Sequence, residues 1–445
     1  MIPCCSRLDW VHIFYVYWLQ CWIRNWIVFT KIGMSSHLLF CLLAAIRNIT
    51  IGLNEWCRLS CSNKSGKSLS FEFLTSIITP VPKGSPRDYS ICKSWRPISC
   101  SSTVCFILEK LLLKRIGPYL QTLDQQFAYK SSHCCTQHIT ILKEAGKKLS
   151  DFHIALLDAT AAFDKISWKR IKTKLIKRNV PPHLRKILQT FMVNTSFKVK
   201  WKDVIHKHKF FASRGVKQGG CMSALLFSAC YDKLITKCST TPAGIILNSC
   251  FLNMLVYADD ILLLSTSPYG LGVLIKETMK FFSEYNDIEL NPNKSQILRM
   301  GKKGSKKIHM TMYDIPIKNE AKYLGVWINN EKLEHARVTR TLYANTNNIF
   351  RQNTNIRNCS FQSKRNIWNA YGNIYALESF KEITSQMRAA HRYMTKFVFT
   401  KEWKLKADLS NENGWLDIRS RSLYRWRRIK RIYLQKVTFS VEAKN

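Results

Sequence analysis

The chain has few acidic residues for its length. Only 29 of its 445 residues are Asp or Glu, against 69 Lys and Arg, which gives a formal net charge of +40. A surplus of this size favours a polyanionic partner, because cationic side chains that contact phosphates release counterions condensed on a nucleic acid. We therefore expect RNA or DNA as the partner rather than an unspecific basic surface.

The sequence also lacks an apolar run long enough to cross a bilayer. The most apolar stretches, residues 11–23 and 32–46, flank a segment with Arg24 and Lys31, and each falls short of the roughly 18–20 residues that a spanning helix needs. We expect residues 1–60 to form a hydrophobic leader of uncertain status. Membrane association is not expected, although this leader leaves it open.

None of the 16 cysteines has Cys-x-x-Cys spacing. Scattered cysteines fit reduced thiols better than a secreted disulfide framework, so we expect the protein in the nucleus and cytoplasm. Cys57 with Cys61, and the cluster at residues 133–138, match no common structural zinc spacing. A P-loop is excluded at Gly66, because Cys61 stands where that motif requires glycine.

Two of the few acidic segments follow strongly apolar residues. Tyr257-Ala258-Asp259-Asp260 lies between apolar runs and predicts a β-hairpin whose turn carries both carboxylates, and Asp158 ends a second apolar run at residues 154–157. Carboxylates at the ends of neighbouring core strands repel each other unless a cation lies between them. A pair of divalent ions about 3.5–4 Å apart is the usual arrangement in phosphoryl chemistry. The pattern therefore predicts a two-metal site.

The periodicity of apolar residues predicts an α+β core. Strands are expected at residues 79–84, up to Asp158, at 197–201 paired with 209–211, at 290–298 and at 322–328. Helices are expected at residues 106–116, from Pro182, after a glycine turn at 215–220, at 274–282 and in the basic segment from about 331.

Seven sequence blocks, in order, resemble a reverse transcriptase of the non-LTR (LINE-type) retrotransposon class. They are residues 80–83, 95–99, 157–164, 215–227, 257–260, 291–294 and 323–326. A lone Tyr-Ala-Asp-Asp is weak support, whereas ordered blocks are specific. The resemblance implies a right-hand polymerase of fingers, palm and thumb with an antiparallel palm sheet. It also implies that the chain copies an RNA template into DNA from a DNA primer or target DNA, using two Mg²⁺ ions and deoxynucleoside triphosphates.

The same resemblance implies an order of domains. Residues 61–150 correspond to the N-terminal part of the fingers, and residues 151–300 to the palm with an interleaved fingers segment. Residues 301–375 correspond to a primer-grip hairpin and thumb, followed by a basic helical region at residues 376–445. Within the last region, residues 425–433 alternate cations with aromatic side chains, as single-strand binding requires.

The resemblance also assigns roles at the metal site. Asp158 and Asp259 bridge both ions. Asp260 is assigned to the same metal site: neighbouring strand residues point to opposite faces, but the turn brings this carboxylate close to the ions. Lys294 is the candidate for protonating the leaving pyrophosphate.

Further residues are implied around the nucleotide. Lys83 and Arg96 are candidates for holding the triphosphate. Phe163 is the ring that leaves no room for a 2′-hydroxyl, with core packing as the competing interpretation. Gln218 and Gly219 are expected to begin a helix and to let a nucleotide or template approach closely. Asp164 is expected to form hydrogen bonds rather than bind metal.

The glycine–glutamine block departs from the family pattern. Gly220-Cys221 stands where Asp-Pro is common, and Ala224 where proline is frequent. These departures keep open an alternative, an inactive or maturase-like RNA-binding remnant, while Phe163 disfavours RNA synthesis on RNA. Because no acid-rich nuclease pattern and no zinc knuckle are present, we expect a polymerase fragment. Residues 302–307 fit a nuclear-import signal or a charged loop.

Overall fold

The computed structural model describes residues 74–83, 88–130, 133–284, 288–301, 313–329 and 331–351, with short stretches between 356 and 393. Within these residues, no helix combines the length and apolarity that crossing a membrane requires. The expectations for residues 1–60, 302–307 and 425–433 lie outside the described residues.

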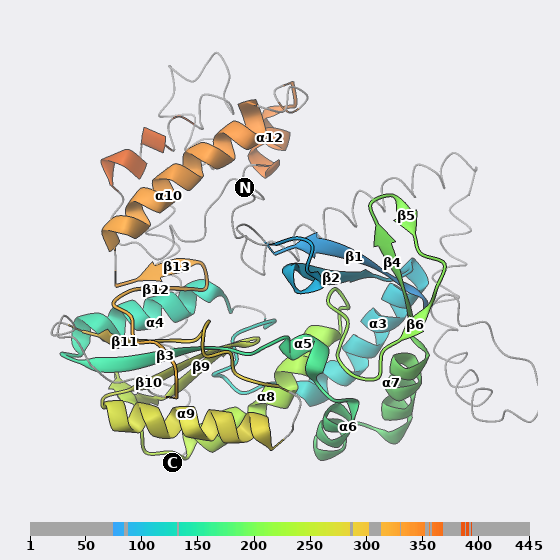
Figure 1. Ribbon diagram of the computed structural model, residues 1–445, viewed down its shortest axis with the longest axis horizontal. Coiled ribbons are helices and arrows are strands. Elements are labelled where there is room, and N and C mark those ends of the chain that lie inside the picture. The colour runs from blue at the N-terminus through green and yellow to red at the C-terminus, as the bar shows by residue number, and fades with distance from the viewer. Residues whose placement is uncertain are drawn as a thin grey trace, which may run out of the picture.

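A four-stranded antiparallel sheet forms the core of the molecule, with strand order β11-β3-β10-β9 (Figure 1). Its strands are β3 (Phe152–Asp158), β9 (Met254–Tyr257), β10 (Asp260–Ser265) and β11 (Gln296–Met300). Because β3 and β10 are buried on both faces, their sequences are continuous apolar runs rather than alternating patterns. The expected antiparallel sheet is confirmed.

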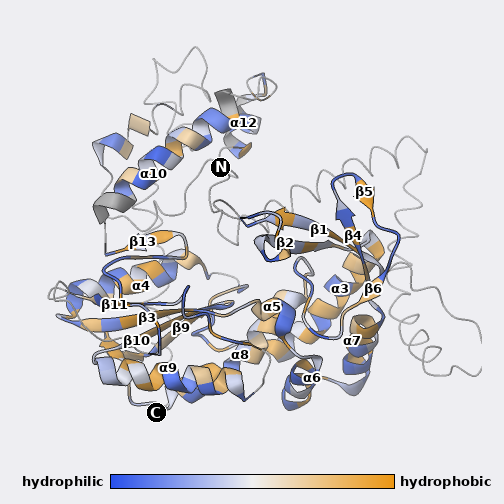
Figure 2. Ribbon diagram, in the orientation of Figure 1, coloured by the Kyte–Doolittle hydropathy of each residue, from blue (hydrophilic) through white to orange (hydrophobic). Residues whose placement is uncertain are grey.

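Both faces of this sheet are covered. Helices α8 (Ser223–Ser239) and α9 (Pro268–Ser283) cover one face, and α4 (Cys135–Lys148) with the hairpin β12 (Ala321–Tyr323) and β13 (Val326–Ile328) covers the other. Strand alternation divides the core accordingly: Leu157 packs in the α8–α9 cluster and Leu156 in the α4 cluster. Figure 2 shows the hydrophobic residues concentrated on the central strands.

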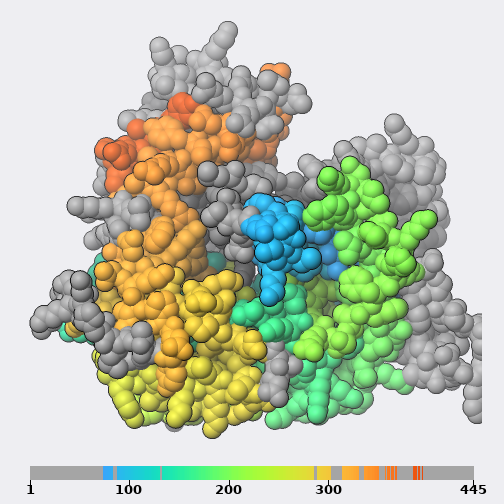
Figure 3. Space-filling model, viewed as in Figure 1, coloured from blue at the N-terminus to red at the C-terminus, as the bar shows by residue number. Residues whose placement is uncertain are grey.

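A second sheet joins segments that are far apart in sequence. Strand β1 (Ser76–Pro82) pairs antiparallel with β2 (Trp95–Cys100) and parallel with β4 (Ser196–Trp201). Strands β5 (Val204–Ile205) and β6 (Phe210–Phe211) both pair with β4. In the space-filling view these strands, in blue and green, adjoin one another on the same face of the molecule (Figure 3).

Helices connect the two sheets. Helix α3 (Thr103–Ile116), the short η3 (Gly117–Leu120), α5 (Ala162–Lys165), α6 (Trp168–Lys177) and α7 (Pro182–Asn194) surround the junction (Figure 1). The remaining elements are η2 (Cys92–Ser94), the hairpin β7 (Ile245–Leu247) with β8 (Cys250–Leu252), α10 (Glu331–Thr346), the π-helical Asn347–Arg351 and α12 (Phe361–Ile367).

Two predicted strands differ from the structure. The strand expected at residues 290–298 begins only at Gln296, because the amides of Lys294 and Ser295 bond to the Asn291 carbonyl at 3.2 and 2.9 Å and close a turn. The segment at 322–328, expected as one strand from periodicity, is two strands joined by a turn, since Leu324 and Gly325 both have positive φ (44° and 84°), as a type I′ turn requires. The hairpin that the family resemblance implied at residues 323–326 is therefore present. Helices α4 and α6 were not predicted.

Candidate active site

The three candidate metal-binding aspartates meet at one end of the central sheet. Asp158 ends β3 and is the direct partner of Asp260, the first residue of β10. Asp259 lies with Ala258 in the turn from β9 to β10, so only one of the two adjacent acids is in the turn. Directly opposed residues in an antiparallel pair project from the same face. Asp260 is therefore the direct neighbour of Asp158 on the adjacent strand. The alternation of side chains along a single strand does not predict such a pairing between strands.

Lys294 reaches the same corner of the sheet. Its Nζ lies 3.6 Å from Asp158 Oδ2, with both side chains partly exposed. The turn that carries Lys294 is bonded to the end of β3, because the Asn291 amide donates to the Asp158 carbonyl at 2.9 Å. The Asp158 amide in turn donates to Ser295 Oγ at 3.2 Å. The Lys294 ammonium group is thus held next to the carboxylates at this end of the sheet.

Carboxylate oxygens are ligands that Mg²⁺ prefers, so the residue types fit a divalent ion. In the described parts of the chain, however, no group of three or more His, Cys, Asp or Glu is gathered so that it could hold one. The register brings the backbones of Asp158, Asp259 and Asp260 to one end of the sheet, but their side chains are not gathered around a common metal position there.

Phe163 is held by aromatic stacking next to this corner. Its ring lies 4.1 Å from that of Phe227 in α8, centroid to centroid, with the planes 12° apart. The residue is only half-buried and packs against both core clusters. The packing interpretation therefore holds for one face of the ring, and part of the side chain is still accessible.

The glycine–glutamine loop joins the two sheets. Gln218 and Gly219 do not begin a helix, contrary to expectation, because the Gly220 amide bonds to the Lys217 carbonyl in a turn and α8 starts at Ser223. The Gln218 carbonyl accepts from the Ser99 amide of β2 at 2.7 Å. Gly219 has φ +118°, a conformation that favours glycine.

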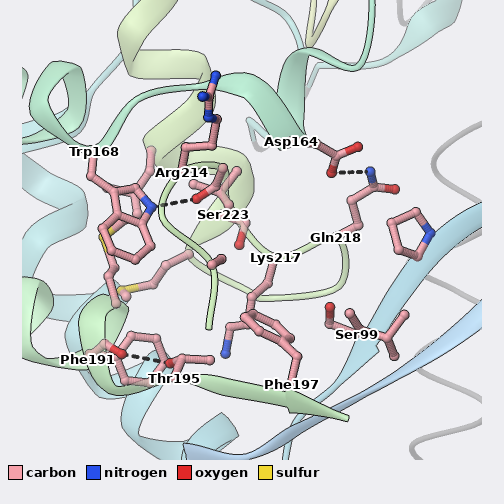
Figure 4. A pocket seen from close by; sticks show the side chains of 18 of the residues that line it. Ser99, Asp164, Trp168, Phe191, Thr195, Phe197, Arg214, Lys217, Gln218 and Ser223 are labelled. Atoms are coloured by element: carbon pink, nitrogen blue, oxygen red, sulfur yellow. Dashed lines mark hydrogen bonds between the residues drawn. The ribbon is translucent and has the colours of Figure 1, made fainter. Parts of the chain in front are cut away.

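The Gln218 side chain also holds Asp164. Its Nε2 donates to Asp164 Oδ1 at 2.8 Å, and the two side chains point toward each other (Figure 4). Asp164 therefore forms hydrogen bonds, as expected. Burial of its carboxyl raises the pKa of Asp164, although part of the residue is exposed, while the Gln218 bond and the charge of Lys83 oppose this shift.

Lys83 and Arg96 lie close to this loop on the second sheet. Arg96 in β2 pairs with Val81 in β1, and Lys83 directly follows β1. The Lys83 Nζ donates to the Lys93 carbonyl at 2.8 Å. Arg96 is therefore on the strand that contacts the Gln218 carbonyl, and Lys83 directly follows the strand paired with it. Lys83 is also within electrostatic reach of Asp164.

A buried ion pair that sequence reasoning missed lies beneath the loop. Glu109 of α3 pairs with Lys217, whose side chain is 9% exposed against 2% for Glu109. Glu109 Oε2 accepts from the Cys221 amide at 2.8 Å. Cys221 stands where the family pattern commonly has proline, so this amide is an additional donor that Glu109 satisfies. The sequence did carry a signal for this pair, because Glu109 is a charged residue next to Leu108 within an apolar helical pattern.

An apolar cavity of about 210 Å³ lies beside this pair (Figure 4). Its wall includes Phe191, Phe197 and Trp168, whose Nε1 donates to the Gly215 carbonyl at 2.8 Å. A Cβ on Gly215, which has φ +82°, would lie 2.7 Å from the Asp164 carbonyl oxygen. The loop therefore packs directly on the chain that follows β3.

An aromatic cluster supports the β9–β10 turn from the α4 side. His138 is fully buried, and its Nδ1 lies 2.8 Å from the Tyr323 hydroxyl. Its ring packs edge-on against Phe127 and Tyr257. Burial lowers the pKa of His138 to about 3, so its ring is neutral. His138 is thus part of the packing that supports the turn.

Residues 81–328 match the family model described as reverse transcriptase (RNA-dependent DNA polymerase). Over 218 residues the chain is 26% identical to the Pol polyprotein from the type-1 retrotransposable element R2 of Nasonia vitripennis. Over 228 residues it is 27% identical to the Pol polyprotein from the type-2 retrotransposable element R2DM of Drosophila melanogaster. These alignments cover 48% and 50% of this chain but 21% of each relative.

Apo telomerase from Candida tropicalis has a similar structure, with a TM-score of 0.46 and 12% identity over 86% of this chain and 68% of that one.

The chain spans about a fifth of the length of the two Pol polyproteins. The family match covers more than half of the chain. The chain therefore belongs to the reverse transcriptase family, with the right-hand polymerase fold, the antiparallel palm sheet and the general use of divalent metal ions that this family implies.

Proposed function

We propose that this chain is the RNA-directed DNA polymerase of a non-LTR retrotransposon, which extends a DNA primer on an RNA template. The observation that carries the proposal is the pairing of Asp158 with Asp260, with Asp259 in the adjoining turn. The matched relatives are Pol polyproteins of R2 elements, which supports the retrotransposon origin. The net charge of +40 suits both nucleic-acid strands.

In this proposal, Asp158, Asp259 and Asp260 hold two Mg²⁺ ions. When bound, such ions lower the pKa of the attacking 3′-hydroxyl and neutralise charge on the leaving pyrophosphate. Lys294 is placed beside Asp158 by its turn, and it donates a proton toward the pyrophosphate. The contact between Lys294 and Asp158 would have to open for this step.

The second sheet and the loop bound to it position the nucleotide. Lys83 and Arg96 neutralise the triphosphate, for which an ammonium group and a guanidinium fork are suited. Gln218 and Gly219 lie in the loop that bonds to β2, where the bare glycine lets a nucleotide or template approach the backbone. We place the protein in the nucleus and cytoplasm, where RNA and target DNA are available.

Primer extension by the purified chain tests this function. With an RNA template, a DNA primer, deoxynucleotides and Mg²⁺, we expect incorporation that stops when the metal is chelated. The rival function is an inactive, maturase-like RNA-binding protein, which the departures at Gly220 and Ala224 motivate. Salt-sensitive RNA binding with no metal-dependent incorporation would establish that rival instead.

Phe163→Ala should lower the preference for deoxynucleotides over ribonucleotides by about 100-fold, the discrimination typical of a single added hydroxyl. Removing the ring opens space for the 2′-hydroxyl. The ratio of kcat/KM values for the two nucleotide types measures the change. Phe227→Leu serves as the control, because it removes the stacking partner and leaves the Phe163 ring. Unchanged discrimination in Phe163→Ala would contradict this role.

A further inference from the structure

Residues 125–128 lie along the outer edge of the palm sheet, next to β9. The Val256 amide donates to the Gln125 carbonyl at 2.8 Å, and the Phe127 amide donates to the Val256 carbonyl at 2.9 Å. Gln126 itself forms a parallel bridge with Val256. The backbone on both sides of Gln126 is therefore bonded to Val256. Val256 lies two residues before the turn formed by Ala258 and Asp259.

The side chain of Gln126 is fully buried and reaches that turn. Its Oε1 accepts from the Ala258 amide at 3.1 Å and from the Ala128 amide at 3.1 Å. Two buried donors that are far apart in sequence thus share one acceptor. Replacing this oxygen with an apolar group would leave both amides unsatisfied away from water.

Ala258 is the point in the turn that most needs support. It is fully buried and has φ +58°, a left-handed conformation that is unfavourable for a residue with a Cβ. A hairpin turn with positive φ at its first central position usually has glycine there. Surrounding contacts must therefore hold this peptide, and the Gln126 bond is made to its amide.

Core packing does not explain a glutamine at this position. Among the described residues no hydrogen-bond partner is found for the buried Gln126 Nε2, and an unpaired buried donor is unfavourable. An apolar residue of the same length would avoid that cost. What glutamine adds is the acceptor oxygen under Ala258.

We propose that Gln126 is a positioning residue for the metal-binding turn, an inference that rests on the proposed polymerase function. By fixing the Ala258 peptide, it sets the direction in which Asp259 and Asp260 leave the turn. It touches neither metal nor nucleotide. Loss of the acceptor lets the Ala258 peptide rotate, which shifts both carboxylates away from Asp158.

Gln126→Met tests this role, because methionine has similar length and no acceptor oxygen at that place. Hydrogen exchange of the Ala258 amide should become at least about tenfold faster, since its buried bond is lost. The affinity for Mn²⁺, measured by water-proton relaxation, should fall about 10–100-fold, as for other residues that orient metal ligands. The Mg²⁺ concentration for half-maximal incorporation should rise by the same factor.

Asn253→Leu is the matched control. Asn253 is a buried amide at the opposite end of the β9–β10 hairpin, and its Nδ2 donates to the Cys238 carbonyl. This variant should lose stability without changing metal affinity or Ala258 exchange. If Gln126→Met does not fold, Gln126→Asn replaces it, since that carboxamide is one methylene too short to reach Ala258.

The outcomes separate the two proposals. A protected Ala258 amide together with unchanged Mn²⁺ affinity in the Gln126 variant would overturn the positioning role, even with an active wild-type enzyme. A wild-type chain that binds RNA but incorporates no nucleotide would overturn the polymerase function, whereas the exchange and Mn²⁺ measurements would still decide the role of Gln126.

Discussion

Replacing Asp158 or Asp259 with asparagine is expected to lower nucleotide incorporation by about 1000-fold or more. The change keeps the size of each side chain and removes the charge that holds the divalent ions. Metal ions contribute several kcal/mol to stabilising the transition state, and each 1.36 kcal/mol is about tenfold in rate. Single-turnover incorporation on a primed RNA template measures the effect.

Asp260→Asn tests whether the residue that pairs with Asp158 across the two strands also contributes to the metal site. Alternation along one strand predicts that Asp260 matters less than Asp259, whereas the pairing of Asp260 with Asp158 predicts a loss of similar size. A loss that matches the Asp259 variant would show that cross-strand pairing decides which acids act together.

Asp314→Asn is the control for these variants. Asp314 is an exposed aspartate with φ 58°, and asparagine is also well tolerated in the left-handed region. This variant should retain full activity. All the variants should keep wild-type RNA affinity and unfolding temperature. Steady incorporation by the Asp259 variant would refute the assignment of the metal site.

Lys217→Met is expected to lower the free energy of unfolding by about 3–5 kcal/mol, the usual cost of removing one partner from a buried ion pair. Glu109 would remain as a buried carboxylate with the Cys221 amide as its hydrogen-bond donor. Methionine keeps the apolar stem over the Phe191 ring, which Lys217 Nζ contacts at 4.6 Å from the centroid. Denaturant-induced unfolding measures the loss.

Combining Lys217→Met with Glu109→Gln should restore most of this stability. The double variant removes both charges and keeps an acceptor for the Cys221 amide. Lys147→Met, which breaks the partly exposed pair with Glu144 at 3.5 Å, is the surface control, and its effect should stay below about 1 kcal/mol. Additive losses from the Lys217 and Glu109 variants would mean that the two charges do not stabilise the loop as a pair.

The sequence by itself determined the family and most of the secondary structure. One apolar run ends in Asp158, and others flank Asp259 and Asp260. These runs identified core strands with acids at their ends, because strands that are buried on both faces are continuously apolar. The family resemblance rested on short sequence blocks in a fixed order, which can be read directly from the chain. The helix at α7 and the pairing of β4 with β6 were also predicted from periodicity.

Only the tertiary structure decided which groups meet. The register that sets Asp260 opposite Asp158, the ion pair of Glu109 with Lys217, and the bond from Gln126 to Ala258 join residues about 100 or more positions apart. A local pattern records how a segment folds and which of its faces is apolar. Which buried polar atoms satisfy one another depends on how distant segments pack, and that is fixed only when the complete core forms.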